Sequence, residues 1–437
     1  MTAQTAPGSA TERLEQCLAK IHDPDLEGDK VFTQLFETEA RLAAAAADRR
    51  ADQGCSLGPL DGRVLSVKDL FDVAGRVTTA GSAVLRNRPA AARDAAAVSR
   101  LRASGAVLIG KTHMTEFAFS GIGINPHYGN PGNPSDRSRI PGGSSSGAVI
   151  SVVDGMADIG IGSDTGGSLR IPAALCGAVG FKPTSGRVPT DGAFPLSTTL
   201  DTVGPIGRFV ADCALADAVL SGTGDDWPEP INPTSLLFTI PRGRLFDDIE
   251  TPVAEAFESA VGALRATGVG IRDSSLEDEL EALKDIDRLG TFTAIELWAR
   301  LQDEGVADLS GLDPRIRSRI ETGRQVPASD YVRMTARRDR LVARMDRRLA
   351  GGEILLLPTV PVLAPGIALL AGDDREFYRV NGAFLRATRL ANLFDLPAIS
   401  LPVTGAPLPV GLMLVGRRQA DRRLLAIAAW VEATLAR

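Results

Sequence analysis

The sequence predicts an α/β fold in which a large mixed β-sheet core is covered by helices on both faces. Segments with helical periodicity alternate along the chain with short apolar runs typical of buried strands. The chain has 437 residues, of which 44% are hydrophobic, so it can bury a large core. This length allows one large domain or two closely packed ones, and we predict a single domain over residues 1–437.

The N-terminal half begins with amphipathic helices and continues with strands and helices in alternation. Residues 10–50 predict helices that cover one edge of the sheet. The run RVLSVKDLFDVAG predicts a strand that ends near Lys68. Residues 93–110 combine an amphipathic helix, a glycine stop and the buried strand AVLIG, and together they predict an α/β unit. A further helix is expected from about Val210 to Leu220.

The C-terminal half begins after a candidate linker. Residues 221–235 are rich in Pro, Gly and Asp, and residues 251–349 are strongly helical, which is typical of a lid or a substrate wall. EILLLPTVPVLAP then predicts a buried strand, followed by a helix, two strands and a closing helix. We divide the domain into an N-terminal helical edge (1–60), a core (61–222), a helical insert or lid (225–350) and a C-terminal part of the core (351–437).

Composition and charge limit the class of partner. The formal net charge of −6 gives no electrostatic basis for tight binding to nucleic acid. The four cysteines form no CxxC pair, which favours reduced thiols. The N-terminus carries Glu and Arg where a signal peptide needs an apolar region, and no run approaches the roughly eighteen apolar residues of a membrane span. We expect a cytoplasmic protein that acts on small molecules and binds neither nucleic acid nor a membrane.

A stretch rich in glycine and serine, from Pro141 to Val188, contains the candidate site. Its two clusters, Gly142–Gly147 and Gly166–Ser168, permit unusual backbone conformations and contain serine hydroxyls. The first cluster matches the G-x-S-x-G nucleophile elbow with Ser145 at its centre. That fold requires a histidine after the nucleophile. His22, His113 and His127 all precede Ser145, so this interpretation is excluded.

Two further interpretations have little support in the spacing. A trypsin-like set would combine His113 or His127 with an aspartate and Ser168, but the α/β pattern does not resemble a pair of β-barrels. A phosphate-binding loop would need G-x-G-x-x-G or G-x-x-x-x-G-K-[ST], and neither occurs in the stretch. A cradle of backbone N–H groups for a transient anion stays open.

The remaining interpretation is acyl transfer by a serine with a lysine as its base. The chain has only six lysines against 42 arginines, and only lysine can lose its proton when buried. At a pKa of about 10.4, roughly one lysine in 2,500 is neutral at pH 7, and lowering that pKa by three units costs about 4 kcal/mol. Lys68 has apolar neighbours and is our candidate base, although it could instead pair with Asp69. Packing or chance is the simpler explanation for Lys111 and Lys182.

At this point the residues resemble a known family. GGSSSG followed by GSDTGGSLRIPAALCGAVGFKPTSGRV, with SVKDLFDVAG upstream and TLDTVGPIGR downstream, is similar to the amidase signature family of serine hydrolases. The similarity extends to GAVLIGKTHMTEFAFSG, NPHYG, LLLPTVPVLAP and PVGLMLVG, and covers nearly the whole chain outside residues 225–350. It implies the amidase-signature fold, with residues 61–222 as the signature core.

The resemblance also implies a mechanism. Ser168 would be the nucleophile, Lys68 the base, and Ser144, after a cis peptide bond, the serine that passes the proton between them. The resemblance assigns the oxyanion hole to four backbone N–H groups, those of Thr165, Gly166, Gly167 and Ser168.

Other residues near the clusters receive supporting roles. Asp164 and Arg170 match charged positions of the signature, and we interpret them as a buried pair that holds the loop. We expect Ser145 and Ser146 to form local hydrogen bonds or orient Lys68, and Cys176 to lie in the core. Phe117, Ala118 and Phe119 are candidates for the lining of the acyl pocket. The chain departs from the family pattern in Val149 and Ile150, which replace small residues behind Ser144.

We therefore predict hydrolysis of a carboxylic amide of a small molecule, with water as the second substrate and without a cofactor or a metal. An amidotransferase A-type subunit that needs a partner protein is one alternative, and a non-catalytic anion-binding protein is another. A homodimer is compatible with the resemblance. The sequence carries no charge pattern that specifies which amide is cleaved.

Overall fold

The computed structural model describes residues 8–224 and 231–436, and in this part of the chain eleven strands form one sheet. The strand order is β1-β3-β2-β4-β6-β5-β10-β11-β9-β7-β8. The strands are β1 (Phe32–Leu35), β2 (Val64–Lys68), β3 (Val107–Thr112), β4 (Ile159–Asp164), β5 (Val179–Lys182), β6 (Thr202–Gly207), β7 (Leu237–Arg242), β8 (Gly270–Ser275), β9 (Ile354–Pro358), β10 (Ala398–Val403) and β11 (Val410–Val415).

The sheet is mixed, as predicted. Strands β3, β2 and β4 pair in parallel, and so do β9, β7 and β8. The strands between these groups, and β1 at the edge, pair antiparallel. Central strands such as β9 and β11 are buried along their whole length, because both faces of the sheet are covered.

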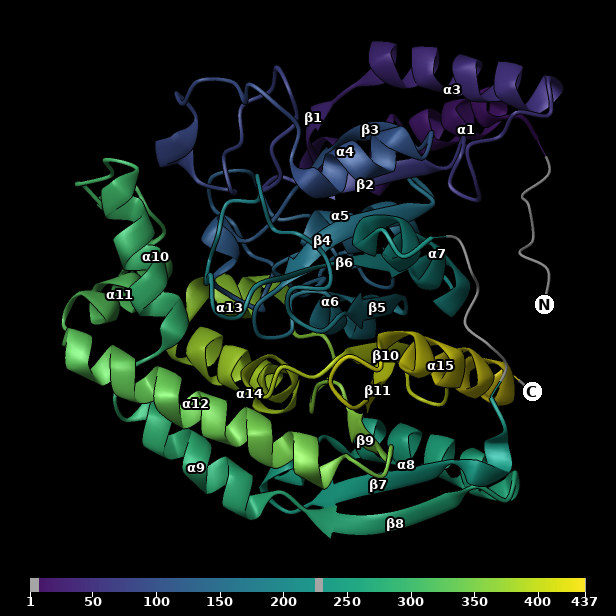
Figure 1. Cartoon of the computed structure of the whole chain (residues 1–437). Coiled ribbons are helices and arrows are strands. Elements are labelled where there is room, and N and C mark those ends of the chain that lie inside the picture. The colour runs from purple at the N-terminus through teal and green to yellow at the C-terminus, as the bar shows by residue number, and fades with distance from the viewer. Residues whose placement is uncertain (1–7, 225–230, 437) are drawn as a thin grey trace.

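The helices lie on both faces of the sheet (Figure 1). They are α1 (Ala10–Ile21), α2 (Gly28–Val31), α3 (Glu37–Asp52), α4 (Ala96–Ala103), α5 (Ser146–Val153), α6 (Arg170–Cys176), α7 (Val210–Ser221), α8 (Thr251–Ala266), α9 (Glu277–Asp287), α10 (Phe292–Asp303), α11 (Pro314–Arg324), α12 (Ala328–Arg348), α13 (Ile367–Gly372), α14 (Asp374–Leu393) and α15 (Asp421–Leu435). Helices α7, α8 and α15 share one hydrophobic cluster, whereas α1, α3, α5 and α6 share another. The predicted fold class is therefore confirmed.

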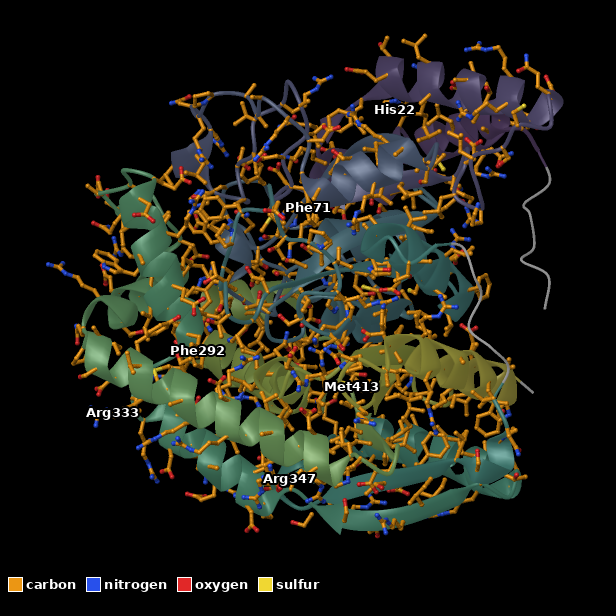
Figure 2. The ribbon with its side chains drawn as sticks, in the orientation of Figure 1. His22, Phe71, Phe292, Arg333, Arg347 and Met413 are labelled. Atoms are coloured by element: carbon orange, nitrogen blue, oxygen red, sulfur yellow. The ribbon has the colours of Figure 1, made fainter. Side chains whose placement is uncertain are left out.

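Helix α12 shows how the sequence pattern sets the orientation of a covering helix. Its buried residues are Met334, Leu341 and Met345, which recur at helical spacing on the inner face of the helix. Arg333 and Arg347 are exposed and project outward from the molecule, whereas Met413 lies in the interior of the sheet (Figure 2). Among the described helices, none combines the length with the apolar character that a bilayer crossing requires.

Two segments differ from the sequence prediction. Residues 10–50 contain the edge strand β1 between their helices, and four residues are too short a run for periodicity to reveal a strand. Residues 225–350 contain the predicted helices but also contribute β7 and β8 to the end of the sheet, so they are not a purely helical insert. Within the predicted linker 221–235, residues 225–230 lie outside the described residues.

Candidate active site

Lys68 ends strand β2, and its buried side chain meets two serines. Its Nζ donates hydrogen bonds to the Oγ atoms of Ser144 at 2.8 Å and Ser163 at 2.9 Å. Burial lowers the pKa of Lys68 to about 7, although the charges of Asp201 and Asp164 act in the opposite direction. A lysine with this pKa is uncharged in about half of the molecules at pH 7, so Lys68 can accept a proton.

The alternative pairing of Lys68 with Asp69 does not occur. Asp69 instead forms a buried ion pair with Lys111, with Nζ and Oδ1 2.6 Å apart. Lys182 is also buried and donates a hydrogen bond to the carbonyl oxygen of Pro183 at 2.7 Å. Lys111 and Lys182 therefore have structural contacts, and Lys68 is the lysine that meets the serine clusters.

Ser144 lies at the start of the loop that leads into α5. The peptide bond between Gly143 and Ser144 is cis, as the resemblance implied. The helix that follows sits close to β3, because a Cβ atom at Gly147 would lie 2.6 Å from the backbone nitrogen of His113. Val149 and Ile150, which depart from the family pattern, are fully buried in the cluster shared by α1, α3, α5 and α6. The departure is therefore accommodated by apolar packing.

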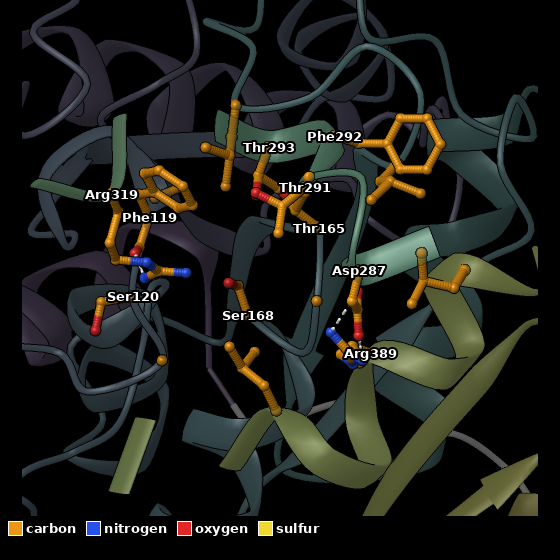
Figure 3. A pocket seen from close by; sticks show the side chains of 18 of the residues that line it. Phe119, Ser120, Thr165, Ser168, Asp287, Thr291, Phe292, Thr293, Arg319 and Arg389 are labelled. Carbon is orange, nitrogen blue, oxygen red and sulfur yellow. Dashed lines mark hydrogen bonds and ion pairs between the residues drawn. The ribbon is translucent and has the colours of Figure 1, made fainter. Parts of the chain in front are cut away.

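Ser168 lines an open cavity, and its hydroxyl points into that cavity (Figure 3). Thr165 and Gly166 form the adjoining wall. The backbone N–H of Ser145 donates to the carbonyl oxygen of Ser168 at 3.3 Å, which joins the two glycine-rich clusters. The two halves of the stretch from Pro141 to Val188 thus meet at the cavity.

The loop that carries Ser168 is organised around the carboxylate of Asp164. This carboxylate accepts hydrogen bonds from the backbone N–H groups of Gly167 at 2.8 Å and Leu169 at 3.1 Å. Burial acts to raise its pKa, but the charge and hydrogen bonds of Arg170, together with Lys182 and Asn392, outweigh burial and lower the pKa of Asp164 to about 2. The N–H of Gly167, which the resemblance assigned to the oxyanion hole, therefore donates to Asp164 in this structure.

Arg170 pairs with Asp164 inside the protein, as the sequence interpretation expected. Both side chains are fully buried, and Nη2 lies 2.9 Å from Oδ1 of Asp164. The guanidinium also donates to the carbonyl oxygen of Thr388 at 2.7 Å and to Oδ1 of Asn392 at 2.8 Å. The pair therefore fastens the Ser168 loop to α14.

Two polar groups near Lys68 and Ser168 were not predicted from the sequence. Ser163 contacts Lys68 from the neighbouring strand β4, and Asp201 accepts a hydrogen bond from Oγ1 of Thr165 at 2.5 Å. Burial raises the pKa of Asp201 to about 6. Ser163 stands in GSDTGGS beside the motif, but nothing in its spacing indicates contact with Lys68.

The remaining predicted residues divide between the cavity and the core. Ala118 and Phe119 line the cavity, as expected. Phe117 does not line it, because its ring is buried and stacks on Phe194 with a centroid distance of 5.5 Å. Cys176 is buried in the core.

Ser145 and Ser146 form local hydrogen bonds. Ser145 donates to the carbonyl oxygen of Ser163 at 3.3 Å, and the Oγ of Ser146 lies 2.8 Å from Nδ1 of His113. Burial lowers the pKa of His113 to about 4, so its imidazole is neutral and hydrogen-bonded away from Ser168. Neither serine contacts Lys68 directly, but Ser145 holds the backbone of the residue that does.

The far wall of the cavity comes from a different part of the chain. Asp287 at the end of α9, Arg319 on α11 and Arg389 on α14 line it, together with residues 290–293 before and within α10 (Figure 3). Asp287 and Arg389 form an ion pair. Strand ends of the core thus supply the candidate chemistry, whereas helices α9, α10, α11 and α14 supply the opposite wall.

These groups define a candidate site for nucleophilic catalysis by a serine. A buried lysine that can lose its proton, a serine in contact with it and a second serine in an open cavity provide a base and two hydroxyls, which nucleophilic catalysis requires.

Comparisons with known proteins identify the family. A family model described as Amidase matches residues 12–425. The 2-amino-5-chloromuconic acid deaminase of Comamonas testosteroni is 40% identical over 91% of this chain and 86% of its own length. The A-type subunit of the glutamyl-tRNA(Gln) amidotransferase from Anaeromyxobacter dehalogenans is 34% identical over 94% of this chain and 89% of its own.

Comparison with solved structures identifies the same family. An amidase crystal structure with 32% identity superposes with a TM-score of 0.87 and covers 98% of this chain and 96% of its own. 6-aminohexanoate cyclic dimer hydrolase in complex with substrate has 26% identity and a TM-score of 0.83, with 98% and 95% covered. The chain belongs to the amidase family, and it is a hydrolase that acts on C–N bonds.

Proposed function

We propose that this protein hydrolyses the carboxylic amide bond of a small molecule through an acyl-enzyme on Ser168. One observation carries the proposal, namely the buried hydrogen bond from Lys68 to Ser144 beside the cavity that Ser168 lines. Because the pKa of Lys68 is lowered to about 7, the lysine can act as a base at neutral pH without a histidine.

The proposed reaction passes one proton along two serines. As Oγ of Ser168 bonds to the amide carbon, its proton moves to Ser144, and the proton of Ser144 moves to uncharged Lys68. The π electrons of the amide carbonyl move onto its oxygen, which becomes the oxyanion. When the tetrahedral intermediate collapses, the C–N bond breaks and Ser144 returns a proton to the leaving nitrogen, while Lys68 returns one to Ser144. Water then hydrolyses the ester by the same relay.

Backbone N–H groups would stabilise the oxyanion. Because Gly167 donates to Asp164, we assign this role to the N–H groups of Thr165, Gly166 and Ser168. Loss of one such donor typically raises the barrier by about 3–4 kcal/mol. The hydrogen bonds of Asp164 and Asp201 to the loop support this assignment, because they hold it at Gly167 and Thr165.

The proposed activity is tested by product and by covalent intermediate. The purified chain is expected to release ammonia from simple primary amides, and the intact protein to gain the mass of the acyl group. Ser168→Ala should abolish both signals. The panel should include amino-substituted unsaturated acids, since a relative is named 2-amino-5-chloromuconic acid deaminase. Release of ammonia by folded Ser168→Ala at the wild-type rate would refute the proposal.

A second candidate is a component of an amidotransferase, because the chain is 34% identical to the A-type subunit of a glutamyl-tRNA(Gln) amidotransferase. That function predicts hydrolysis or transfer only when a partner protein is added, whereas the proposed hydrolase acts alone. A non-catalytic anion-binding protein would not be labelled at Ser168 by a fluorophosphonate probe. We also propose that the protein is cytoplasmic, which cell fractionation tests. Light scattering tests whether it forms a homodimer.

A further inference from the structure

Arg319 is a cation in the cavity wall whose charge is not matched by a neighbouring acid. It is half-buried on α11 and lines the same cavity as Ser168. Within residues 8–224 and 231–436, no carboxylate forms an ion pair with its guanidinium, although most arginines around the cavity and on α11 have such a partner. Burial lowers the pKa of Arg319 to about 10, so the guanidinium is still protonated at neutral pH.

The guanidinium of Arg319 is held in a fixed orientation. Its centre lies 4.1 Å from the centroid of the Phe119 ring, and its Nη1 donates a hydrogen bond to the carbonyl oxygen of the same residue. A guanidinium has five N–H donors, so this contact leaves others for a ligand. In Figure 3 the free end of the fork points into the cavity, on the side that Ser168 faces.

The second arginine of the cavity differs from Arg319. Arg389 forms a bidentate ion pair with Asp287, and both side chains are about one third exposed. The charged lining residues are therefore two arginines and one aspartate, which leaves one positive charge, and that charge belongs to Arg319. Apolar residues such as Leu196, Leu200 and Phe292 complete the wall and would strengthen the attraction of an anion.

We propose that Arg319 binds a carboxylate of the substrate, so that the preferred substrates are amides that carry a second, anionic end. This inference rests on the proposed amide hydrolysis. The planar guanidinium fits the two oxygens of a carboxylate, and stacking on Phe119 holds it in a fixed orientation before the ligand binds. The acid end would lie against α11 and the amide carbon against Ser168, so the distance between the two residues selects the chain length.

The experiment compares charged and neutral amides of equal length. Succinamic, glutaramic and adipamic acids are each paired with butyramide, valeramide and hexanamide, and kcat/KM is measured by ammonia release. We expect the wild-type protein to prefer one acid over its neutral partner by about 10- to 100-fold, because a charge-assisted hydrogen bond contributes about 1.5–3 kcal/mol. Equal rates for all pairs would overturn the proposal.

Variants separate binding from folding. Arg319→Gln should raise KM for the preferred acid by about 10- to 100-fold while changing the neutral amide by less than about threefold, and Arg319→Lys should recover part of the loss. Arg317→Gln is the matched control, because it removes the same charge from α11 outside the cavity lining. If Arg319→Gln lowers the rates of both amides equally, Arg319 only supports the Phe119 backbone and the proposal is wrong.

Binding without turnover distinguishes this proposal from the proposed hydrolysis. Calorimetry with succinate, glutarate and adipate on the Ser168→Ala protein measures the carboxylate site alone. Binding that is lost in Ser168→Ala/Arg319→Gln would support the site even if no amide of the panel is hydrolysed. Hydrolysis of neutral amides without any dicarboxylate binding would refute the site and leave the hydrolase function intact.

Discussion

The lowered pKa of Lys68 predicts a pH profile that the wild-type protein must follow. With a pKa of about 7 and hydrogen bonds to Ser144 and Ser163, Lys68 is half uncharged at pH 7. The value of kcat/KM for a neutral amide should therefore reach a plateau above about pH 8. It should fall tenfold for each pH unit below the pKa, to about 1% of the plateau at pH 5.

Two variants test whether this profile belongs to Lys68. Lys68→Arg keeps the charge but cannot lose a proton near neutrality, and Lys68→Met keeps the length without a base. Both should reduce kcat/KM by about 100- to 10,000-fold at the plateau, the usual contribution of a general base. Circular dichroism and thermal melts verify that each variant is folded. A wild-type rate that stays constant from pH 8 to pH 5, or an active Lys68→Arg protein, would refute the relay.

The same pKa has a consequence for stability, with a sign opposite to that of a salt-bridged lysine. The pKa of Lys68 is about 7 in the folded protein and near 10.5 when the chain is unfolded. Between these values the unfolded chain binds more protons, so the free energy of unfolding rises with pH. From pH 7 to pH 9 the wild-type protein should gain about 2 kcal/mol relative to Lys68→Met in urea unfolding. Parallel curves for the two proteins would contradict the lowered pKa.

Three further predictions concern the residues around the relay. Arg170→Met leaves the carboxylate of Asp164 buried without its cation, so it should lower the free energy of unfolding by about 3–5 kcal/mol in urea titrations. A loss below about 1 kcal/mol would show that the pair does not fasten the loop. Gly167→Ala would place a Cβ 2.4 Å from the hydroxyl oxygen of a threonine on α14 and should remove most of the activity. Gly186→Ala is the control, because Gly186 also has a positive φ but open space around it, and it should cost only about 1–2 kcal/mol of stability. Ser163→Ala removes one of the two acceptors of the candidate base and should lower kcat about tenfold without changing KM, and a change in KM alone would argue against this role.

The catalytic candidates could be predicted because short runs with distinctive composition surround them. Strand β2 is mostly apolar before Lys68, and a pair of glycines precedes both Ser144 and Ser168, so the pattern marks both the elements and the hydroxyls. The absence of a histidine after the serines then left lysine as the base. Burial of Lys68 follows from its place at the end of a central strand, which periodicity can indicate.

Other features depend on contacts that no local pattern records. Ser163 reaches Lys68 because β2 and β4 are neighbours in the sheet, and this pairing is set by the whole topology. Phe117 and Phe119 are two residues apart, yet one stacks in the core and the other lines the cavity, since the backbone between them turns through positive φ values. Arg319 belongs to a helix that carries several arginines, and the tertiary structure alone distinguishes it from them.

The origin of the two cavity walls bears on how such an enzyme could evolve. Lys68, Ser144 and Ser168 stand on the central sheet and its adjoining loops, whereas Arg319 stands on a helix more than a hundred residues further along the chain. Under the two proposals above, a mutation in α11 can therefore alter which compound is accepted without displacing a donor or acceptor of the proposed proton path. In the proposed mechanism, catalysis and substrate selectivity depend on separate parts of the chain, so new substrates can be acquired with little effect on the reaction itself.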